Sequence, residues 1–292
     1  DYLLISREDI LRGGLKSIEG IVLRSRLQID SEILKALPEL KWIARSGSGL
    51  ENIDLADAQS KGVKVFNSPE GNRDAVGEHV LGMILMIFHK LKSGDRTVHE
   101  RAWDREAHRG TELSSKTVGI IGYGVMGTAF ASKLSGLGCK VIAYDKYKKG
   151  FSSDIVEEVT ESDFFYRSDI VSVHVPWTSE TKQLVNSSWL AKFKKTIVFV
   201  NSSRGAVVNT SDLLDALDLG QVSHIALDVI EFEGNSLEGL DKVKDKESRA
   251  TLARLLASPN VFLSPHVAGW TKESYIKLST YLADKILHDF PA

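Results

Sequence analysis

The chain has one cysteine, no long hydrophobic run and no long basic run, and each scarcity excludes a class of protein. Cys139 has no second thiol in the chain to pair with, so we expect a buried, unreactive side chain in a reducing cytoplasm. The longest apolar run, Val80 to Phe88, is interrupted by Gly82 and is too short to span a bilayer. No secretory signal sequence is visible.

An excess of one charge is also missing, because 37 Lys and Arg residues face 39 Asp and Glu residues, and the formal net charge is −2. Nucleic acid and anionic membranes are therefore not expected as partners, and we expect no bound metal. With 42% hydrophobic and 26% charged residues, the 292-residue chain has the composition of a globular protein. Its length allows two domains with separate cores.

A glycine fingerprint is the most informative stretch that is present. The β-branched run Val118 to Ile121 predicts a buried strand, and Gly122-x-Gly124-x-x-Gly127 follows it directly into a helix. Gly122 allows a tight turn, Gly124 lets the backbone approach a pyrophosphate, and Gly127 lets the helix pack on the strand. The helix N-terminus then favours phosphate. The predicted cofactor loop is Gly122, Tyr123, Gly124, Val125, Met126 and Gly127.

An acidic residue follows the next predicted strand. Lys140 to Tyr144 is a strand that ends at Asp145, eighteen residues after Gly127. A carboxylate at this position accepts hydrogen bonds from a ribose 2′-OH and repels a 2′-phosphate, which favours NAD over NADP. Three lysines follow Asp145, and we interpret them as solvated loop residues.

The spacing of apolar runs predicts an α/β fold with two parts. From residue 117 onward, six runs near 117–121, 140–144, 169–173, 196–200, 223–227 and 260–263 predict a doubly wound Rossmann sheet. Before it, runs at 2–5, 20–23, 40–44 and 63–66 predict a smaller α/β layer, with helices capped by Ser31 and Asp54. A long helix from about 72 to 92 joins the two parts.

The last amphipathic stretch, 271–288, follows the sixth Rossmann strand, and we expect it to pack back on the first part of the chain. The smaller domain is then discontinuous in sequence. We therefore predict a substrate domain of residues 1–92 and 264–292 and a dinucleotide-binding domain of residues 93–263.

Polar side chains follow three of the predicted Rossmann strands, where ligands bind in open α/β sheets. Arg204 comes after the fourth strand, Asp228 and Glu233 after the fifth, and His266 after the sixth. Each alone is more often a solvated or structural residue. Together they form the set that orients a 2-oxo acid, moves a proton and tunes the group that moves it.

The combined pattern resembles the D-isomer-specific 2-hydroxyacid dehydrogenases over nearly the whole chain. In the second part, it comprises Gly122-x-Gly124-x-x-Gly127 with Asp145, His174-Val-Pro176-x-Thr178-x-x-Thr181, Asn201-x-Ser-Arg204-Gly205, Asp228-x4-Glu233 and Ser264-Pro265-His266. In the first part, the matching stretches are Arg45-Ser-Gly47-Ser-Gly49 and Asn67-Ser-Pro69-x-x-Asn72. The resemblance implies a Rossmann domain beside a smaller flavodoxin-like domain, with NAD as cofactor.

The resemblance also implies residue roles. Arg204 would bind the substrate carboxylate and carbonyl, His266 would be the acid/base, and Glu233 would hold the His266 tautomer and favour its protonated form. The remaining cofactor residues implied are His174, Pro176, Thr181 and Asp228. The substrate residues implied are Arg24, Arg45, Ser48, Gly49 and Asn72.

Several alternatives stay open within this resemblance. Arg24 and Arg45 match positions resembling the phosphate-contacting arginines of D-3-phosphoglycerate dehydrogenases, whereas glyoxylate, hydroxypyruvate or another 2-oxo acid is the competing substrate. The C-terminal-binding corepressors, which sense NAD and act as interaction proteins, and formate-type dehydrogenases share the pattern. The resemblance suggests a homodimer formed through residues 72–109, including Trp103.

Two positions depart from the family's pattern. Asn209 replaces the usual aspartate, and we interpret it as the N-cap of a helix from Thr210. The chain also begins near the family's second strand, so we expect an initial strand and helix to be absent.

Overall fold

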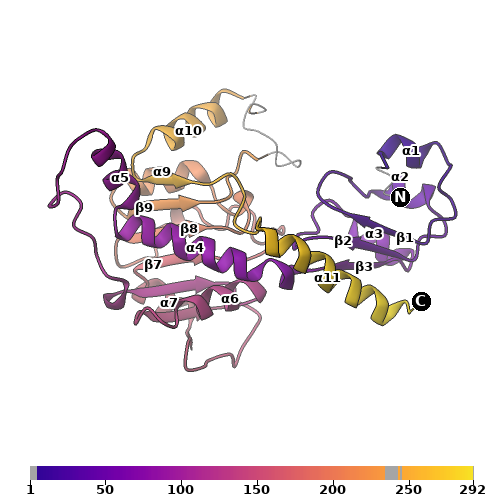
Figure 1. Cartoon of the computed structure of the whole chain (residues 1–292), viewed down its shortest axis with the longest axis horizontal. Helices are drawn as coiled ribbons and strands as arrows, with labels where there is room; N and C mark the ends of the chain where they lie inside the picture. Colours follow the sequence, from indigo (N-terminus) through magenta and orange to yellow (C-terminus); the bar gives the residue numbers. More distant parts are fainter. Residues whose placement is uncertain (1–4, 234–242, 244, 292) are drawn as a thin grey trace. The chain divides into compact units, whose positions relative to one another are not determined.

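The computed structural model describes residues 5–233, 243 and 245–291, which form two compact units. The smaller unit comprises residues 5–72 and 270–291, and the larger comprises residues 73–233, 243 and 245–269. Each unit is built around a parallel sheet with flanking helices, so the predicted α/β class is confirmed. Figure 1 shows the elements of both units.

The larger unit has a seven-stranded sheet in which every neighbouring pair is parallel. In sheet order, its strands are β10 (Val261–Leu263), β9 (Val222–Leu227), β8 (Ile197–Asn201), β7 (Ile170–Val173), β4 (Thr117–Ile121), β5 (Lys140–Tyr144) and β6 (Glu157–Glu158). The order reverses at β4, as in a doubly wound Rossmann sheet, and the crevice beside β4 and β7 is where such folds bind dinucleotides.

Side chains alternate between the two faces of this sheet, and each face has its own helices. On one face, Val118, Ile120 and Val200 pack with the helices α4 (Arg73–Phe88) and α6 (Val125–Leu134). On the other face, Ile121 and Phe199 pack with a different set of helices. This set is α7 (Glu161–Arg167), α8 (Ser187–Leu190), α9 (Thr210–Asp218) and α10 (Lys246–Ala257). Both faces are therefore covered, which explains the continuous apolar strands.

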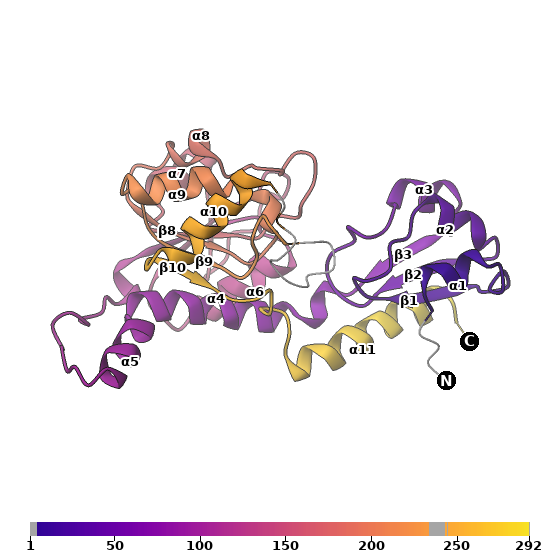
Figure 2. The same cartoon turned by 90° about the horizontal axis from the view of Figure 1, so that it is seen from above.

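The remaining elements of the larger unit are short. They are α5 (Leu91–His99) and the 3₁₀ turns η2 (Leu113–Ser115) and η3 (Gly205–Val207). Helix α5 has no buried residue and extends from the end of α4 (Figure 2). The expected helix to residue 92 is thus two helices, because Lys90 adopts a left-handed φ of 51° between them.

The smaller unit has a parallel sheet in the order β1 (Gly20–Leu23), β2 (Trp42–Arg45) and β3 (Lys64–Asn67). Its other elements are α1 (Arg7–Leu11), α2 (Ser31–Ala36), α3 (Leu55–Ser60), η1 (Pro69–Gly71) and α11 (Lys272–Asp289). Leu282 of α11 packs with Ala44 of β2 and Phe66 of β3. The prediction that the C-terminal helix packs on the first part of the chain is confirmed (Figure 1).

The structure differs from the predicted elements at several places. The unit boundaries fall at 72/73 and 269/270 rather than at 92/93 and 263/264, because α4 packs its apolar side on α6 and the sheet. Asp30, not Ser31, caps α2, since its carboxylate accepts from the N–H groups of Glu32 and Ile33. Residues 2–4 of the strand predicted at 2–5 lie outside the described residues.

Two smaller expectations concern Cys139 and membrane spans. Cys139 is half-buried, and burial raises the pKa of its thiol, in keeping with an unreactive side chain. Within the described ranges, no helix is both long and apolar enough to cross a membrane.

Candidate active site

The candidate cofactor and catalytic residues of the larger unit lie where its parallel strands end. Gly122 follows β4, Asp145 follows β5 and His174 follows β7. Arg204 and Asp228 come after β8 and β9, respectively. Because the strands are parallel, these residues share the carboxyl edge of one sheet, which is the edge that binds ligands in this architecture.

The glycine loop has room for a ligand at one of its three glycines only. A Cβ at Gly122 would lie 2.7 Å from the His174 carbonyl oxygen, and one at Gly127 would lie 2.2 Å from the Gly122 carbonyl oxygen. A Cβ at Gly124 would meet no atom of the described residues within 4 Å, so space beside this backbone is open. Gly124 is also the N-cap of α6. The loop therefore fits a pyrophosphate held by the N–H groups of the helix N-terminus.

Asp145 is tied to the glycine loop. Its carboxylate accepts the N–H of Tyr123 at 2.8 Å and those of Tyr147 and Lys148 at 2.9 and 2.8 Å. Burial alone would raise the pKa of Asp145, but these hydrogen bonds outweigh it and hold the pKa below its ordinary value. The side chain is therefore an anion at neutral pH, as a group facing a ribose 2′-OH requires.

The three lysines after Asp145 are exposed, in keeping with solvated loop residues, and each also has an acceptor in or near the loop. Lys149 Nζ donates to the Asp145 carbonyl oxygen at 2.8 Å, and Lys148 Nζ donates to the Tyr123 carbonyl oxygen at 3.3 Å. Lys146 forms an ion pair with Glu180. These bonds hold the lysines against the loop, because its carbonyl oxygens and Glu180 offer acceptors within reach.

His174 is buried at the end of β7. Its Nε2 lies 2.8 Å from Ser172 Oγ, its Nδ1 has no hydrogen-bond partner among the described residues, and burial lowers its pKa to about 4. In the loop that follows, Thr181 Oγ1 donates to the Pro176 carbonyl oxygen at 2.6 Å and accepts from the Thr178 N–H at 2.8 Å. Thr181 thus shapes the loop, and its direct contact with the cofactor stays a prediction.

Asn201 and Gly205 fix the turn that presents Arg204. The buried Asn201 side chain donates to the Arg204 carbonyl oxygen at 2.9 Å and accepts from the Ser203 N–H at 2.9 Å. A Cβ at Gly205 would lie 1.9 Å from the Ile230 carbonyl oxygen, so glycine is needed here for close approach of two loops. Arg204 Nη1 donates to the Ser203 carbonyl oxygen at 2.6 Å, which fixes one edge of the guanidinium group.

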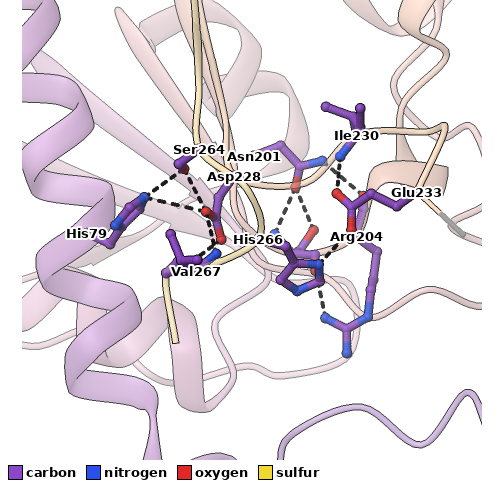
Figure 3. Close-up of polar contacts among 11 residues, drawn as sticks. His79, Asn201, Arg204, Asp228, Ile230, Glu233, Ser264, His266 and Val267 are labelled. Carbon is purple, nitrogen blue, oxygen red and sulfur yellow. Dashed lines mark hydrogen bonds and ion pairs between the residues drawn. The ribbon is translucent and has the colours of Figure 1, made fainter. Parts of the chain in front are cut away.

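His266 and Glu233 form the hydrogen bond that the sequence predicted. His266 Nδ1 lies 2.6 Å from Glu233 Oε2, and Glu233 Oε1 accepts the Ile230 N–H at 2.5 Å. The two side chains are 26% and 18% exposed, so both are shielded but reachable. Figure 3 shows the Arg204 guanidinium beside this pair. Arg204, Glu233 and His266 therefore converge, although they come from three separate loops.

Asp228 is buried beneath this site. Its carboxylate accepts the N–H groups of Val267 and Ala268 at 2.9 and 2.8 Å and the Ser264 hydroxyl at 2.6 Å. These bonds hold the segment that carries His266, while contact between Asp228 and a cofactor stays a prediction. Glu231, from the same loop, accepts instead from Gln183 and from the N–H of Thr210.

His79 of α4 also lies at this site and was not predicted from the sequence. His79 Nε2 lies 2.8 Å from Ser264 Oγ and 3.5 Å from Asp228 Oδ1 (Figure 3). The available signal was its position, since it shares a helical face with the buried Val76 and Met83. A histidine on an apolar face calls for a polar partner beneath it.

The predicted substrate residues belong to the smaller unit. Ser48 Oγ donates to Asn72 Oδ1 at 2.9 Å, and a Cβ at Gly47 would lie 1.4 Å from Arg45 Nη1. The loop from Arg45 to Gly49 is thus built around the Arg45 guanidinium. Arg24 follows β1, which pairs with the strand that ends at Arg45, and its guanidinium lies 4.6 Å from the ring centre of Trp270 and 5.3 Å from that of Tyr275. Their substrate roles stay predictions.

No group of three or more His, Cys, Asp or Glu side chains suited to a metal occurs among residues 5–233, 243 and 245–291.

The family model described as D-isomer specific 2-hydroxyacid dehydrogenase, NAD binding domain, matches residues 81–268. This match covers the glycine loop, Asp145 and the three converging side chains. It confirms NAD as the cofactor that the loop and Asp145 predicted.

Curated relatives agree with this match. The D-3-phosphoglycerate dehydrogenase of Archaeoglobus fulgidus is 34% identical over 286 residues, covering 97% of this chain and 51% of the relative. The chain therefore spans about half the length of that relative. The hydroxypyruvate reductase of Thermotoga maritima is 32% identical over 283 residues, covering 97% of this chain and 88% of the relative.

A solved structure is also similar. The D-lactate dehydrogenase from Aquifex aeolicus, complexed with NAD and lactic acid, superimposes with a TM-score of 0.81 and 29% sequence identity. The superposition covers 94% of this chain and 84% of that one.

Proposed function

Because the chain belongs to the D-isomer-specific 2-hydroxyacid dehydrogenase family, we propose that it transfers hydride between NAD(H) and a D-2-hydroxy acid or its 2-oxo acid. The observation that carries this proposal is the hydrogen bond of 2.6 Å between His266 Nδ1 and Glu233 Oε2. It joins an acid/base side chain to a carboxylate at the sheet edge that holds the dinucleotide loop. That combination suits carbonyl reduction.

In the direction of reduction, NADH when bound supplies the hydride to the carbonyl carbon of the 2-oxo acid. The bond through Nδ1 leaves His266 Nε2 as the nitrogen that gives a proton to the carbonyl oxygen. The carbon gains the hydride's electron pair, the oxygen gains the proton, and the product is a 2-hydroxy acid. Glu233 accepts from Nδ1 in both protonation states of the ring, so it fixes the tautomer and stabilises the imidazolium before transfer.

Arg204 orients the substrate. A guanidinium group matches a planar carboxylate with two parallel hydrogen bonds, and Arg204 lies beside His266 (Figure 3). The bond from Nη1 to the Ser203 carbonyl oxygen restricts the rotation of the group, which lowers the entropy lost on binding. The carbonyl oxygen of a clamped 2-oxo acid is then held within reach of His266.

The substrate that we propose first is 3-phosphoglycerate with its oxidised partner, 3-phosphohydroxypyruvate. Arg24 and Arg45 provide two cations for a dianionic phosphate in the smaller unit. Hydroxypyruvate is the second candidate, since the Thermotoga maritima reductase is matched over 88% of its length. The two acids differ by one phosphate group, so the arginines should decide between them.

A substrate panel tests the proposal directly. NADH oxidation is followed by the absorbance of the reduced nicotinamide with 3-phosphohydroxypyruvate, hydroxypyruvate, glyoxylate and pyruvate, and NADPH is run in parallel. We expect turnover with NADH and at least one of these acids. Binding of NADH without turnover would favour an NAD-sensing interaction protein, and CO₂ release from formate would favour a formate-type dehydrogenase.

Arg204→Ala separates the substrate from the cofactor. We expect most of kcat/KM to be lost while NADH affinity survives, because the guanidinium group serves the 2-oxo acid. Equal losses of both would make Arg204 a structural residue.

We also propose that the chain acts as a homodimer through the segment from α4 to about residue 109. Leu91, Val98 and Trp103 in this segment are 56%, 52% and 79% exposed, so the segment offers apolar side chains to a second copy. Light scattering after gel filtration should give twice the chain mass for the wild type. At micromolar concentration, Trp103→Ser should have a lower average mass. An unchanged monomeric mass in the wild type would remove this proposal.

A further inference from the structure

His266 has an unusual backbone conformation for its residue type. Its φ is 54°, in the left-handed region that favours glycine and that costs other residues on the order of 1–3 kcal/mol. Such a conformation persists only where surrounding bonds enforce it. The conformation determines where the imidazole ring points, so the groups that enforce it also position the ring.

Asp228 supplies those bonds through both its backbone carbonyl and its carboxylate. Its backbone carbonyl oxygen accepts the His266 N–H at 2.8 Å. Its carboxylate accepts the next two N–H groups, from Val267 at 2.9 Å and from Ala268 at 2.8 Å. Asp228 is 1% exposed, so these bonds lie in a shielded environment where a misplaced carboxylate is costly.

The direction of the hydrogen bonds shows what holds the carboxylate in turn. Ser264 Oγ lies 2.6 Å from Asp228 Oδ1 and 2.8 Å from His79 Nε2. Both carboxylate oxygens of Asp228 already accept N–H groups, and the contact of 2.6 Å is far shorter than the 4.0 Å from Ser264 Oγ to Met83 Sδ, so the single hydroxyl proton of Ser264 goes to Asp228. His79 must then donate from Nε2 to Ser264. The chain of donors therefore runs in one direction, from His79 through Ser264 to Asp228.

His79 is anchored on a rigid element. It belongs to α4, whose neighbouring residues Val76, Val80 and Met83 are buried in the core of the larger unit. Ser264, by contrast, lies after the three-residue strand β10. The helix is thus the fixed end of the chain of bonds, and the segment carrying His266 is the end that is held (Figure 3).

We propose that His79 is a positioning residue for the acid/base His266, acting through Ser264 and the Asp228 carboxylate. This inference rests on the proposed function, because it assigns His79 a purpose in the same proton transfer. Removing the donor frees the Ser264 hydroxyl to rotate and the Asp228 carboxylate to turn. The segment 264–268 then samples other conformations, and the His266 ring is less often aligned with the substrate.

The kinetic test uses His79→Ala and His79→Gln, since glutamine keeps an N–H donor near the position of Nε2. His79→Ala should lower kcat about tenfold, the value of one hydrogen bond near the upper end of the usual range, with NADH affinity and substrate KM changed less than twofold. His79→Gln should recover most of the loss. His288→Ala, the same change at an exposed site on α11, is the matched control, and melting temperatures are compared for all variants.

A second measurement does not depend on turnover. Hydrogen–deuterium exchange of a peptide covering residues 264–269 reports the N–H groups that Asp228 binds. Exchange should be about tenfold faster in His79→Ala than in the wild type, and near wild-type in His79→Gln. If the wild type turns over none of the acids but exchange behaves in this way, the proposed function fails while the positioning role stands.

Three outcomes would overturn the proposal. Wild-type kcat and exchange in His79→Ala would show that the donor is not needed. Loss of NADH affinity equal to the loss in kcat would show that His79 and Asp228 serve the cofactor. Failure of His79→Gln to recover either readout would mean that the ring's packing, not its donor, matters.

Discussion

Two strand ends of the same sheet carry a histidine, and only one of them has the surroundings of an acid. His174, after β7, is 9% exposed, and its Nε2 lies 2.8 Å from the hydroxyl oxygen of Ser172. Its pKa is lowered to about 4 by burial, so it is neutral at physiological pH. His266, after β10, is 26% exposed and bonded to the Glu233 carboxylate. The imidazole is common to both sites, so access and a carboxylate partner distinguish them.

The difference shows how one ring type serves two purposes in one fold. At the β7 end, burial removes water and leaves a neutral ring that packs beside Phe130. At the β10 end, Glu233 and Asp228 hold the ring and its backbone while leaving Nε2 for the substrate. Variants that exchange or remove these features should therefore affect chemistry at one end and stability at the other.

The largest effect is expected from His266→Gln. Glutamine keeps polarity at this position but cannot carry a transferable proton at neutral pH, so kcat should fall by about 10²–10⁴-fold. NADH affinity, measured by fluorescence titration, should stay within a few-fold of the wild type. A kcat near the wild-type value would show that another group supplies the proton.

The features that the sequence predicted correctly are those set by residues close together in the chain. The glycine fingerprint, the Asp54 cap of α3 and the Asn209 cap of α9 are each encoded within a few residues, and the structure has all three. Strand β6 was missed because Glu157 and Glu158 give no apolar signal and only two residues pair. Its place in the sheet depends on β5, not on its own composition.

The features that could not be predicted from the sequence depend on hydrogen bonds between residues far apart in the chain. Ser264 is 185 positions from His79, so no local pattern predicts that contact. Asp228 was expected to face the cofactor, yet most of its accepting capacity is used by residues 264–268. The choice of Asp30 over Ser31 as a cap likewise depends on backbone angles that either residue could adopt.

The β7 end should be visible in the pH dependence of stability. The folded pKa of His174, about 4, lies below the value of about 6.5 for an unfolded histidine. The unfolded chain therefore binds more protons between these values, and the free energy of unfolding falls as pH drops from 6.5 to 4. The loss should total about 3 kcal/mol, and His174→Gln should remove it.

Urea denaturation at half-unit pH steps measures this contribution. The wild-type curve contains the titration of other groups, so the difference between wild type and His174→Gln is the quantity to plot. If the free energies of unfolding of the wild type and His174→Gln changed in parallel from pH 6.5 to 4, His174 would be accessible to water in the folded chain.

Glu233→Gln sharpens the comparison at the β10 end. Glutamine can still accept from His266 Nδ1 but carries no charge, so the imidazolium loses its stabilising partner. We expect kcat to fall about 10–10²-fold, less than for His266→Gln, with little change in NADH affinity. Glu231→Gln is the matched control, since Glu231 lies on the same loop and bonds to Gln183 and Thr210 instead. Equal losses in both variants would point to the loop rather than to the pair.

The smallest effect is expected from Ser172→Ala at the β7 end. The change removes the partner of His174 Nε2 and leaves both ring nitrogens buried without a hydrogen bond, since Nδ1 already has none. One unsatisfied buried nitrogen should cost about 1–2 kcal/mol at pH 8, where the ring is neutral in both folded and unfolded chains. Urea denaturation measures the loss, and Ser279→Ala on α11 is the control. An unchanged free energy of unfolding would mean that water reaches Nε2. The His174 ring would then not be shielded from solvent, and burial would no longer distinguish it from His266.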